Sequence, residues 1–347
     1  MNFTNDIYFD HNYGKLYEKN EYGKTEIFRY EDSIGVIESQ FIKRIIPNSI
    51  DNNTYYDICT PYGYGGPRIV SCKPERKEEL VKLYEKSFEK YCMENGIVHE
   101  FVRFHPVLNN ALDFKDMYSL EFRRKTLGTN LKISDDPIKS ELSKNCRNKI
   151  KNIFNKGVTY EIIVGPHTLY DFIIPYYETM RRNNAAEDYY FSEEYFENLV
   201  KYFKDQIIYI KTFWNGKLIG ATVNFFCNGL IQFHLSGIYS EYLNLAPSYV
   251  MFYALVLWGI ENNCSLVHYG GGRTPAPDDG LYLFKRKFAQ NTEFDYYVSD
   301  KIWNEEVYKK LYYSLGGNDT FSNLVKKSIR EMNVPMTAKN MSTNNNV

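Results

Sequence analysis

The sequence has little of what defines several large classes of protein. Its 42 Lys and Arg residues nearly balance 43 Asp and Glu residues, so the formal net charge is −1. A protein that coats a nucleic-acid backbone needs a basic face, and this balance argues against that class while leaving room for a local basic patch. The first 20 residues lack the apolar core of a signal peptide, and the longest apolar helical segment, Tyr249–Ile260, is too short to span a bilayer. These absences predict a cytoplasmic protein without a membrane span.

Cysteine is sparse and unpatterned. The six cysteines form no C-x-x-C pair, and no short cluster of His and Cys has the spacing of a zinc site. Single, scattered cysteines in a chain of this size are typical of reduced and mostly buried thiols. We therefore expect no metal site and no tightly bound cofactor.

The second half of the chain carries strong local signals for an ordered unit. Two Asn-Gly pairs, at 215–216 and 228–229, separate three apolar runs between Ile207 and Tyr239, which predicts a three-stranded antiparallel meander. A helix over Pro247–Asn263 and a strand over Leu266–Tyr269 are expected to follow. The first half shows a looser copy of the same order of strands, helix and strand.

At 347 residues the chain is long enough for two domains of mixed α and β structure, an α+β class with mostly antiparallel sheets flanked by helices. We expect an N-terminal domain over 1–157, which includes a basic helix over Asp135–Lys156 and which the C-terminal helices within 300–335 could join. The second domain is expected over 158–299. The Asn-, Ser- and Thr-rich tail, 337–347, is expected to be disordered.

The most informative segment is His268–Phe288, HYGGGRTPAPDDGLYLFKRKF. Three glycines follow a strand-like run, then come an arginine, a proline-broken polar loop with two aspartates, and Phe284-Lys285 three residues before Phe288. Glycines after a strand allow backbone to approach a ligand or a neighbouring strand closely. A lysine framed by aromatic rings has a partly desolvated charge, which suits contact with an anionic or carbonyl oxygen.

This segment, with other pieces in the expected order, resembles the Fem-type (FemA- and FemX-like) peptidoglycan aminoacyltransferases and the BioF2-like acetyltransferases of the GNAT superfamily. The other pieces include Pro61-Tyr-Gly-Tyr-Gly-Gly-Pro67, Glu100-Phe-Val-Arg-Phe-His-Pro106 and the basic helix around Arg147. The resemblance implies two GNAT-like acyltransferase units in tandem.

Two features depart from the pattern. The stretch Tyr242–Ser248 lacks the glycines with which acetyl-CoA enzymes hold pyrophosphate on backbone amides, and no long charged helical hairpin of the kind thought to hold tRNA is present. The missing glycines weaken the case for plain acetyl-CoA binding in the second unit.

The resemblance implies a set of site residues, each of which also has a purely structural interpretation. Lys285 could contact the acyl carbonyl or an anion or be a solvated lysine, Phe284 could serve the reaction or the core, and Gly271 and Gly272 could open a channel or end a strand tightly. Arg103 could bind an anionic ligand or pair with an internal carboxylate. The implied catalytic residues are Lys285 and Phe284, the substrate-binding residues are Tyr62, Tyr64, Gly65, Gly66, Arg103, Arg147, Gly271, Gly272 and Arg273, and the donor-binding residues are Tyr239 and Ser248.

The function expected from the resemblance is N-acyl transfer without a covalent enzyme intermediate. The donor would be aminoacyl-tRNA or an acyl-CoA. The acceptor would be an amine of a nucleotide-activated muropeptide or of an amino sugar, held in the first unit or in a cleft between the units. The alternatives are a plain acetyl-CoA-dependent N-acetyltransferase and a binding module that has lost its chemistry. We expect the chain to act as a monomer.

Overall fold

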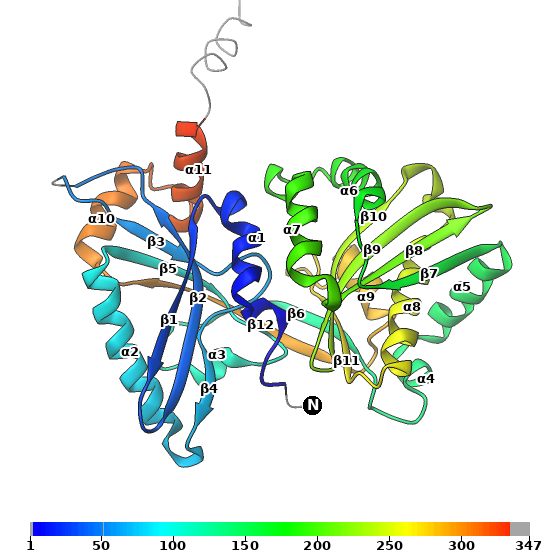
Figure 1. Ribbon diagram of the computed structural model, residues 1–347, viewed down its shortest axis with the longest axis horizontal. Coiled ribbons are helices and arrows are strands. Elements are labelled where there is room, and N and C mark those ends of the chain that lie inside the picture. The colour runs from blue at the N-terminus through cyan, green and yellow to red at the C-terminus, as the bar shows by residue number, and fades with distance from the viewer. Residues whose placement is uncertain (1–2, 51, 334–347) are drawn as a thin grey trace, which may run out of the picture. The chain divides into compact units, whose positions relative to one another are not determined.

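The computed structural model describes residues 3–50 and 52–333, and the expected disordered tail lies outside these residues. The chain divides into two compact units, each described here by itself (Figure 1). The N-terminal unit holds Tyr8–His105, Asn109–Glu121 and, of the described residues after these, 297–333. The C-terminal unit holds the chain up to Ile7, Pro106–Leu108 and Phe122–Tyr296. Residues 122–157, which the sequence placed in the first domain, thus group with the second unit, because β6 pairs with β11 there.

The N-terminal unit is built on a mixed sheet in the order β1-β2-β3-β5-β12, with β4 paired to β2. Only β3 and β5 run parallel; the other pairs are antiparallel. Its strands are β1 (Lys24–Glu31), β2 (Gly35–Ile45), β3 (Tyr56–Cys59), β4 (Arg68–Cys72), β5 (Ile97–Arg103) and the end of β12 (Glu293–Ile302). Its helices are α1 (His11–Glu21), α2 (Lys77–Glu94), α3 (Asn110–Asp113), α10 (Glu305–Ser314) and α11 (Phe321–Asn333).

Side chains alternate between the two faces of this sheet. On one face, Phe41 packs with Phe88 of α2. On the other, His99 packs against Phe321 of α11 and Tyr308 of α10. Helices α10 and α11 therefore complete the N-terminal unit (Figure 1).

The C-terminal unit holds the other strands of the sheet, in the order β6-β11-β10-β9-β8-β7, and among these described strands only β10 and β11 run parallel. The strands are β6 (Glu121–Asn130), β7 (Val158–Val164), β8 (Ile207–Trp214), β9 (Lys217–Cys227), β10 (Leu230–Ile238) and β11 (Leu266–Gly270). The helices are α4 (Pro137–Glu141), α5 (Lys144–Asn155), α6 (Tyr170–Arg182), α7 (Glu193–Phe203), α8 (Pro247–Glu261) and α9 (Gly280–Arg286). The predicted meander, the helix after it and the following strand are all confirmed as β8–β10, α8 and β11.

The local chemistry of the sequence explains several boundaries in this unit. Asn215-Gly216 and Asn228-Gly229 have positive φ at all four residues, as the tight turns of a right-twisted hairpin require. The expected basic helix over Asp135–Lys156 is wrong as one element. The backbone of Leu142, in the middle of that range, is extended and ends the first helix, α4. Ser143 then caps a new helix, α5, because its hydroxyl accepts a hydrogen bond from the backbone N–H of Cys146.

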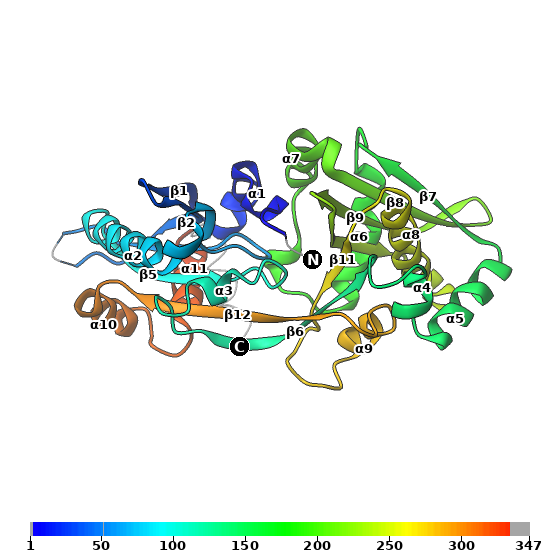
Figure 2. The ribbon, with the colours of Figure 1, turned by 90° about the horizontal axis from the view of Figure 1, so that it is seen from below.

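The two faces of the sheet in this unit bury different helices. Phe225 packs against Phe203 of α7, whereas its neighbour Phe226 packs against Trp258 of α8. On the first face, Gly237 of β10 is needed because a Cβ there would lie 2.4 Å from the backbone nitrogen of Tyr176 in α6. Helices α6 and α7 thus cover one face, and α8 with α5 beside it covers the other (Figure 2).

The two units repeat one arrangement. In each, antiparallel strands lead to a single parallel pair, and an antiparallel strand flanks that pair: β2-β3-β5-β12 in one unit and β9-β10-β11-β6 in the other. A helix, α2 or α8, lies between the two parallel strands in sequence. The fold is therefore a tandem of two like α+β units. Among the described residues, no helix combines the length and the apolar character that crossing a membrane requires.

Candidate functional site

The parallel strands β10 and β11 part in the middle of the sheet of the C-terminal unit. Their pairing covers Leu230–Gln232 opposite Leu266–His268, and within the described residues it ends there although β10 continues to Ile238. Immediately afterwards, His234 is an extra residue in β10, because Phe233 pairs with Asn224 and Leu235 with the adjacent Val223 of β9. Such a bulge bends a strand. We call the opening between Phe233–Ile238 and Tyr269–Gly272 the wedge.

The wedge exposes backbone groups of β10. The backbone N–H of Tyr239 donates to the carbonyl of Ile219 in β9. Hydrogen-bonding groups alternate between the two sides of a strand, so the backbone N–H and C=O groups of Ile238 and Ser236 point away from β9. At Ile238 the N–H donates to the hydroxyl of Thr179 at 2.9 Å. The backbone N–H and C=O of Ser236, which is half-buried, face the wedge and are placed to pair with an extended ligand.

Helix α8 begins at the far end of the connection that leaves β10. A short 3-10 helix, Ser240–Leu245, occupies the stretch that lacks the usual glycines, and Ala246 precedes Pro247 with φ 53°. No side chain caps α8, so the first-turn amides, including that of half-buried Ser248, carry the positive end of the helix dipole. Tyr239 lies at the other end of this connection, half-buried, with its pKa raised by burial.

Lys285 lies inside the unit rather than on its surface. Its side chain on α9 is 8% exposed, and its Nζ donates to the carbonyl oxygen of Gly271 at 2.6 Å. Burial lowers the pKa of Lys285 to about 7, although the carboxylate of Asp279 opposes the shift. The adjacent Phe284 packs edge-on against the rings of Tyr249 and Phe252 at 5.1 Å, which gives it a core contact.

The glycine loop is held closely by its neighbours. A Cβ on Gly271 would lie 2.8 Å from Cδ of Arg124, and a Cβ on Gly272 would lie 2.4 Å from Oδ1 of Asp279. Arg124 donates from Nη1 to the carbonyl of Gly272 at 2.6 Å. After Gly272 the loop extends outward before it returns to α9 (Figure 2).

Asp279 organises this loop as a helix cap. Its carboxylate accepts hydrogen bonds from the backbone N–H groups of Arg273, Thr274 and Tyr282. These bonds lower the pKa of Asp279 to about 2 against the opposing effect of burial. Such a carboxylate is a poor proton acceptor, and the exposed Arg273 is tied to it only through its backbone.

A second group of predicted residues meets in the N-terminal unit. The N–H of Gly65 donates to the carbonyl of Arg103 at 2.7 Å, and Nη1 of Arg103 donates to the carbonyl of Thr60 at 2.9 Å. The guanidinium lies 4.8 Å from the ring centre of Phe101. Within the described residues, no carboxylate lies within ion-pair distance of Arg103, and the internal ion pair considered from the sequence is not formed.

The tyrosines of the same loop pack within an aromatic cluster. Tyr64 lies 5.3 Å from Tyr8 and 5.5 Å from His105, measured between ring centres. The carbonyl of Tyr62 accepts from the hydroxyl of Tyr13 at 2.9 Å. Gly66 is constrained by φ 83° and by Val102, which a Cβ would approach to 2.9 Å. Tyr62, Tyr64, Gly65, Gly66 and Arg103 thus lie in the N-terminal unit, whereas the other predicted residues belong to the C-terminal unit.

Arg147 has a structural partner. Its Nη1 donates to the carbonyls of Lys139 and Leu142, which closes the end of α4. It lies on α5 beside Lys144 and Lys151, which share its exposed face at helical spacing.

The sequence did not indicate Ser236 or the bulge at His234, because a bulge is defined by a register between two strands. Burial lowers the pKa of His234 to about 3, and its Nε2 lies 3.0 Å from the hydroxyl of Tyr195.

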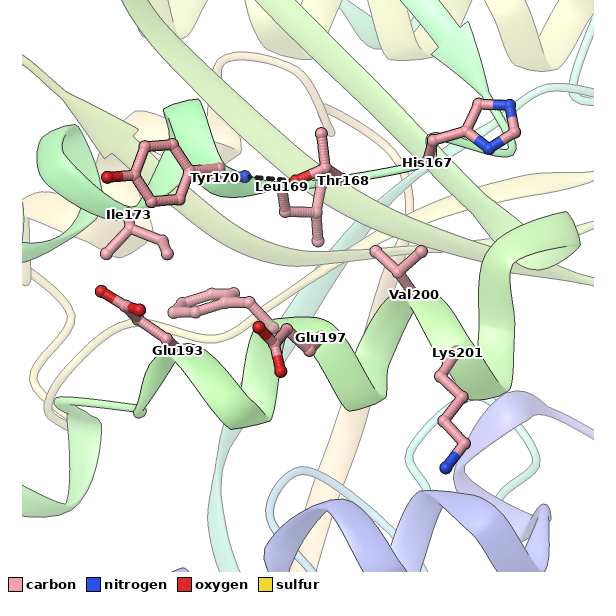
Figure 3. Close-up of a pocket in the computed structure, with 10 residues that line it drawn as sticks. His167, Thr168, Leu169, Tyr170, Ile173, Glu193, Glu197, Val200 and Lys201 are labelled. Carbon is pink, nitrogen blue, oxygen red and sulfur yellow. Dashed lines mark hydrogen bonds between the residues drawn. The ribbon is translucent and has the colours of Figure 1, made fainter.

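A separate cavity of about 260 Å³ lies between the start of α6 and helix α7 (Figure 3). Buried Leu169, Ile173 and Phe196 are among its lining residues. Glu193 and Glu197 line it from α7. None of the residues predicted to bind donor or acceptor lines this cavity. Across the described part of the chain, no group of three or more His, Cys, Asp or Glu side chains is arranged to hold a metal ion.

Comparisons with known proteins agree with this geometry. Residues 140–286, which include the wedge, α8 and Lys285, match the family model described as an acetyltransferase (GNAT) domain. The chain is similar in fold to the crystal structure of FemX, with a TM-score of 0.65 and 13% identity over 88% of this chain and 94% of that one. It is also similar to L-PGS from Bacillus licheniformis, with a TM-score of 0.52 and 13% identity over 91% of this chain and 100% of that one.

The C-terminal domain of a putative lysylphosphatidylglycerol synthetase from Agrobacterium fabrum is another structural relative, with a TM-score of 0.53, 11% identity and coverage of 84% of this chain and 91% of that one. A sequence search among curated proteins found no match. Residues 140–286 thus match a GNAT acetyltransferase domain, and the chain as a whole is similar in fold to the tandem arrangement of FemX. The resemblance expected from the sequence is therefore confirmed.

Proposed function

We propose that the protein is an N-acyltransferase that holds its acyl donor in the wedge of the C-terminal unit. The observation that carries the proposal is the parting of β10 and β11, which turns the backbone of Ser236 toward the opening. An extended acyl carrier would pair with this strand edge, as added strands do in other proteins. Uncapped amides at the start of α8 would favour the phosphates of the carrier.

In the reaction, the neutral amine of the acceptor attacks the acyl carbonyl and forms a tetrahedral oxyanion. The C–O or C–S bond to the carrier then breaks, and the proton lost by the amine leaves with the carrier's oxygen or sulfur. Backbone N–H groups at the wedge would stabilise the oxyanion, and positioning of the two substrates would supply much of the remaining rate. Lys285, with a pKa of about 7, would supply a cation beside the glycine loop at neutral pH.

The donor classes remain aminoacyl-tRNA and acyl-CoA, and the first is favoured. The 3-10 helix Ser240–Leu245 and Ala246 occupy the place where a glycine loop would hold the pyrophosphate of CoA. We therefore infer weak binding of free CoA, in the high micromolar range or worse. A binding module without turnover is the second candidate, and the same altered loop favours it.

The acceptor is assigned to the N-terminal unit, at Tyr62–Gly66 and Arg103. Aromatic rings there would stack on a sugar or base, and the guanidinium would bind a phosphate or carboxylate. The resemblance to Fem-type enzymes supports a nucleotide-activated muropeptide, and an amino sugar is the other acceptor class. We place this reaction in the cytoplasm and assign it to the monomer.

The test combines donor binding with a variant that removes one amide. Ser236→Pro deletes the N–H that faces the wedge but takes no hydrogen bond from the β9–β10 ladder, so the unit should still fold. We expect acyl transfer from the preferred donor to fall about tenfold or more, the effect of losing one hydrogen bond to the substrate. Ser236→Ala keeps the amide and should retain activity.

Calorimetry with free CoA and transfer assays with aminoacyl-tRNA and acetyl-CoA identify the donor. Binding of free CoA at roughly micromolar Kd or tighter would contradict the donor preference and favour an ordinary N-acetyltransferase. Tight binding of a donor with no transfer to any amine acceptor would favour the binding module. Full activity in Ser236→Pro would contradict the assigned donor site.

A further inference from the structure

Four buried polar side chains form a continuous hydrogen-bonded chain at the point where the wedge begins. Gln232 and His268 form the last residue pair between β10 and β11. Nδ1 of His268 lies 2.8 Å from Oε1 of Gln232, and its Nε2 lies 2.9 Å from Oγ1 of Thr126 on β6. Nε2 of Gln232 donates to Oδ2 of Asp6 at 2.6 Å. Each of the four residues is 1% exposed.

The direction of the bonds in this chain follows from its end, where Nε2 of Gln232 donates to Oδ2 of Asp6. Gln232 presents its amide N–H₂ to Asp6, so its carbonyl oxygen faces His268. Nδ1 of His268 must then carry the proton, and its Nε2 accepts from the hydroxyl of Thr126. The other oxygen of Asp6 accepts from the N–H of Ile7 at 2.7 Å. A buried hydrogen-bonded network of this kind rigidifies the elements that it joins.

The elements joined here are the two walls of the wedge. Only Phe233 separates Gln232 from the extra residue His234 of the β10 bulge, and Tyr269 and the glycine loop follow His268 directly. Asp6 comes from a segment more than 200 residues away in the sequence, yet it belongs to the same unit. It reaches the apex of the wedge from the face of the sheet opposite α8, because Val267 and Tyr269 pack into the core beneath α8.

We propose that Asp6 and Gln232 are positioning residues that set the opening of the wedge and thereby its affinity for the acyl donor. That the ligand is an acyl donor rests on the proposed function, whereas the role of Asp6 and Gln232 in holding the two strands does not. The carboxylate of Asp6 orients the Gln232 amide, and the amide orients His268 at the end of the parallel pairing. Loss of that orientation lets the two strands part at a different residue.

Two single variants and the double variant that combines them test the donor-to-acceptor order of the hydrogen bonds from His268 through Gln232 to Asp6. In Asp6→Asn, the new N–H₂ group faces the N–H₂ of Gln232 or the N–H of Ile7, unless Gln232 turns over and His268 carries its proton on Nε2 instead of Nδ1. In either case the orientation that the wild-type carboxylate sets is lost. In Gln232→Glu, two carboxylates meet at the 2.6 Å contact. The double variant moves the carboxylate from position 6 to position 232. The new amide at position 6 then donates to the new carboxylate at position 232, which still accepts from His268. Every donor again faces an acceptor, so the double variant should restore the wild-type geometry.

Hydrogen exchange followed by mass spectrometry reads the geometry without any ligand. We expect faster exchange in peptides that cover 233–238 and 269–272 in each single variant, and a return toward wild type in the double variant. The donor KM should rise about tenfold in each single variant, as expected when a hydrogen bond to a charged group is lost, while the acceptor KM stays within about twofold. Thr212→Val is the matched control, because it removes a buried hydroxyl bond to the carbonyl of Gly220 elsewhere in the same sheet.

Three outcomes would overturn the inference: exchange that rises evenly through the C-terminal unit, single variants that lose thermal stability but keep the wild-type donor KM, or a double variant no better than the single ones. Free CoA and aminoacyl-tRNA serve as the binding probes. If the wild-type protein binds neither, the proposed function fails, and the exchange data still decide whether Asp6 and Gln232 hold the wedge.

Discussion

Nζ of Lys285 donates to the carbonyl oxygen of Gly271 at 2.6 Å, from a side chain that is 8% exposed. An ammonium group so deeply placed carries three donors, and burying them is costly unless a ligand supplies further acceptors. This contact joins the two halves of the segment that the sequence singled out, the glycine run and the Phe284-Lys285 pair. It also makes the role of Lys285 testable in two independent ways.

The first test is activity. We expect Lys285→Met and Lys285→Ala to reduce acyl transfer by about 100-fold or more while the fold is kept, because one electrostatic contact in the transition state is lost. Steady-state rates with saturating donor and acceptor, together with circular dichroism, provide the measurement. Near wild-type turnover in Lys285→Met would show that the lysine has no part in the reaction.

The second test uses pH. The pKa of Lys285 is about 7 in the folded protein, lowered by burial from 10.5. Between these values the unfolded chain binds more protons at this residue, so its contribution makes the free energy of unfolding rise with pH, by at most about 1.4 kcal/mol per pH unit. Lys285→Met should remove this slope between pH 7 and 10. Urea unfolding of both proteins at several pH values measures it, and parallel curves would mean that Lys285 is not perturbed.

Arg103 provides a test of the acceptor site. We expect Arg103→Lys to raise the acceptor KM by about tenfold and leave the donor KM nearly unchanged, because an ammonium cannot bind an anion through two parallel hydrogen bonds. Arg29→Lys is the matched control, since Arg29 lies on an exposed strand of the same unit and pairs with Glu31 and Glu38. A sharp fall in melting temperature with an unchanged acceptor KM would identify Arg103 as a structural residue that holds the carbonyl of Thr60.

Ala246 tests the local conformation at the start of α8. Its φ of 53° is unfavourable for a residue with a Cβ, and glycine adopts it without that cost. We expect Ala246→Gly to stabilise the protein by about 0.5–1 kcal/mol. Ala254→Gly, the same change inside the helix α8, should destabilise it instead. Thermal or urea unfolding distinguishes the two, and a destabilising effect at Ala246 would contradict the strained conformation.

The sequence by itself determined the features that depend on neighbouring residues. Asn-Gly turns and apolar runs were enough for the meander β8–β10, because those turns adopt few conformations and set the hairpin register. The order of elements and the segment His268–Phe288 were enough to predict the resemblance to a GNAT domain, which residues 140–286 match. The basic helix expected over Asp135–Lys156 failed at Leu142, where the cap at Ser143 competes with helix continuation.

Tertiary structure alone decided which residues meet. The wedge exists because β10 pairs with β11 for only three residues, and neither strand carries a local signal for where that pairing stops. Ser236 faces the opening through the register with β9, and Asp6 reaches Gln232 across more than 200 residues of chain. Burial, which lowers the pKa of Lys285, likewise depends on the packing of α9 against the unit. Long-range pairing and burial are properties of the folded chain, whereas turn chemistry and periodicity are already present in the sequence.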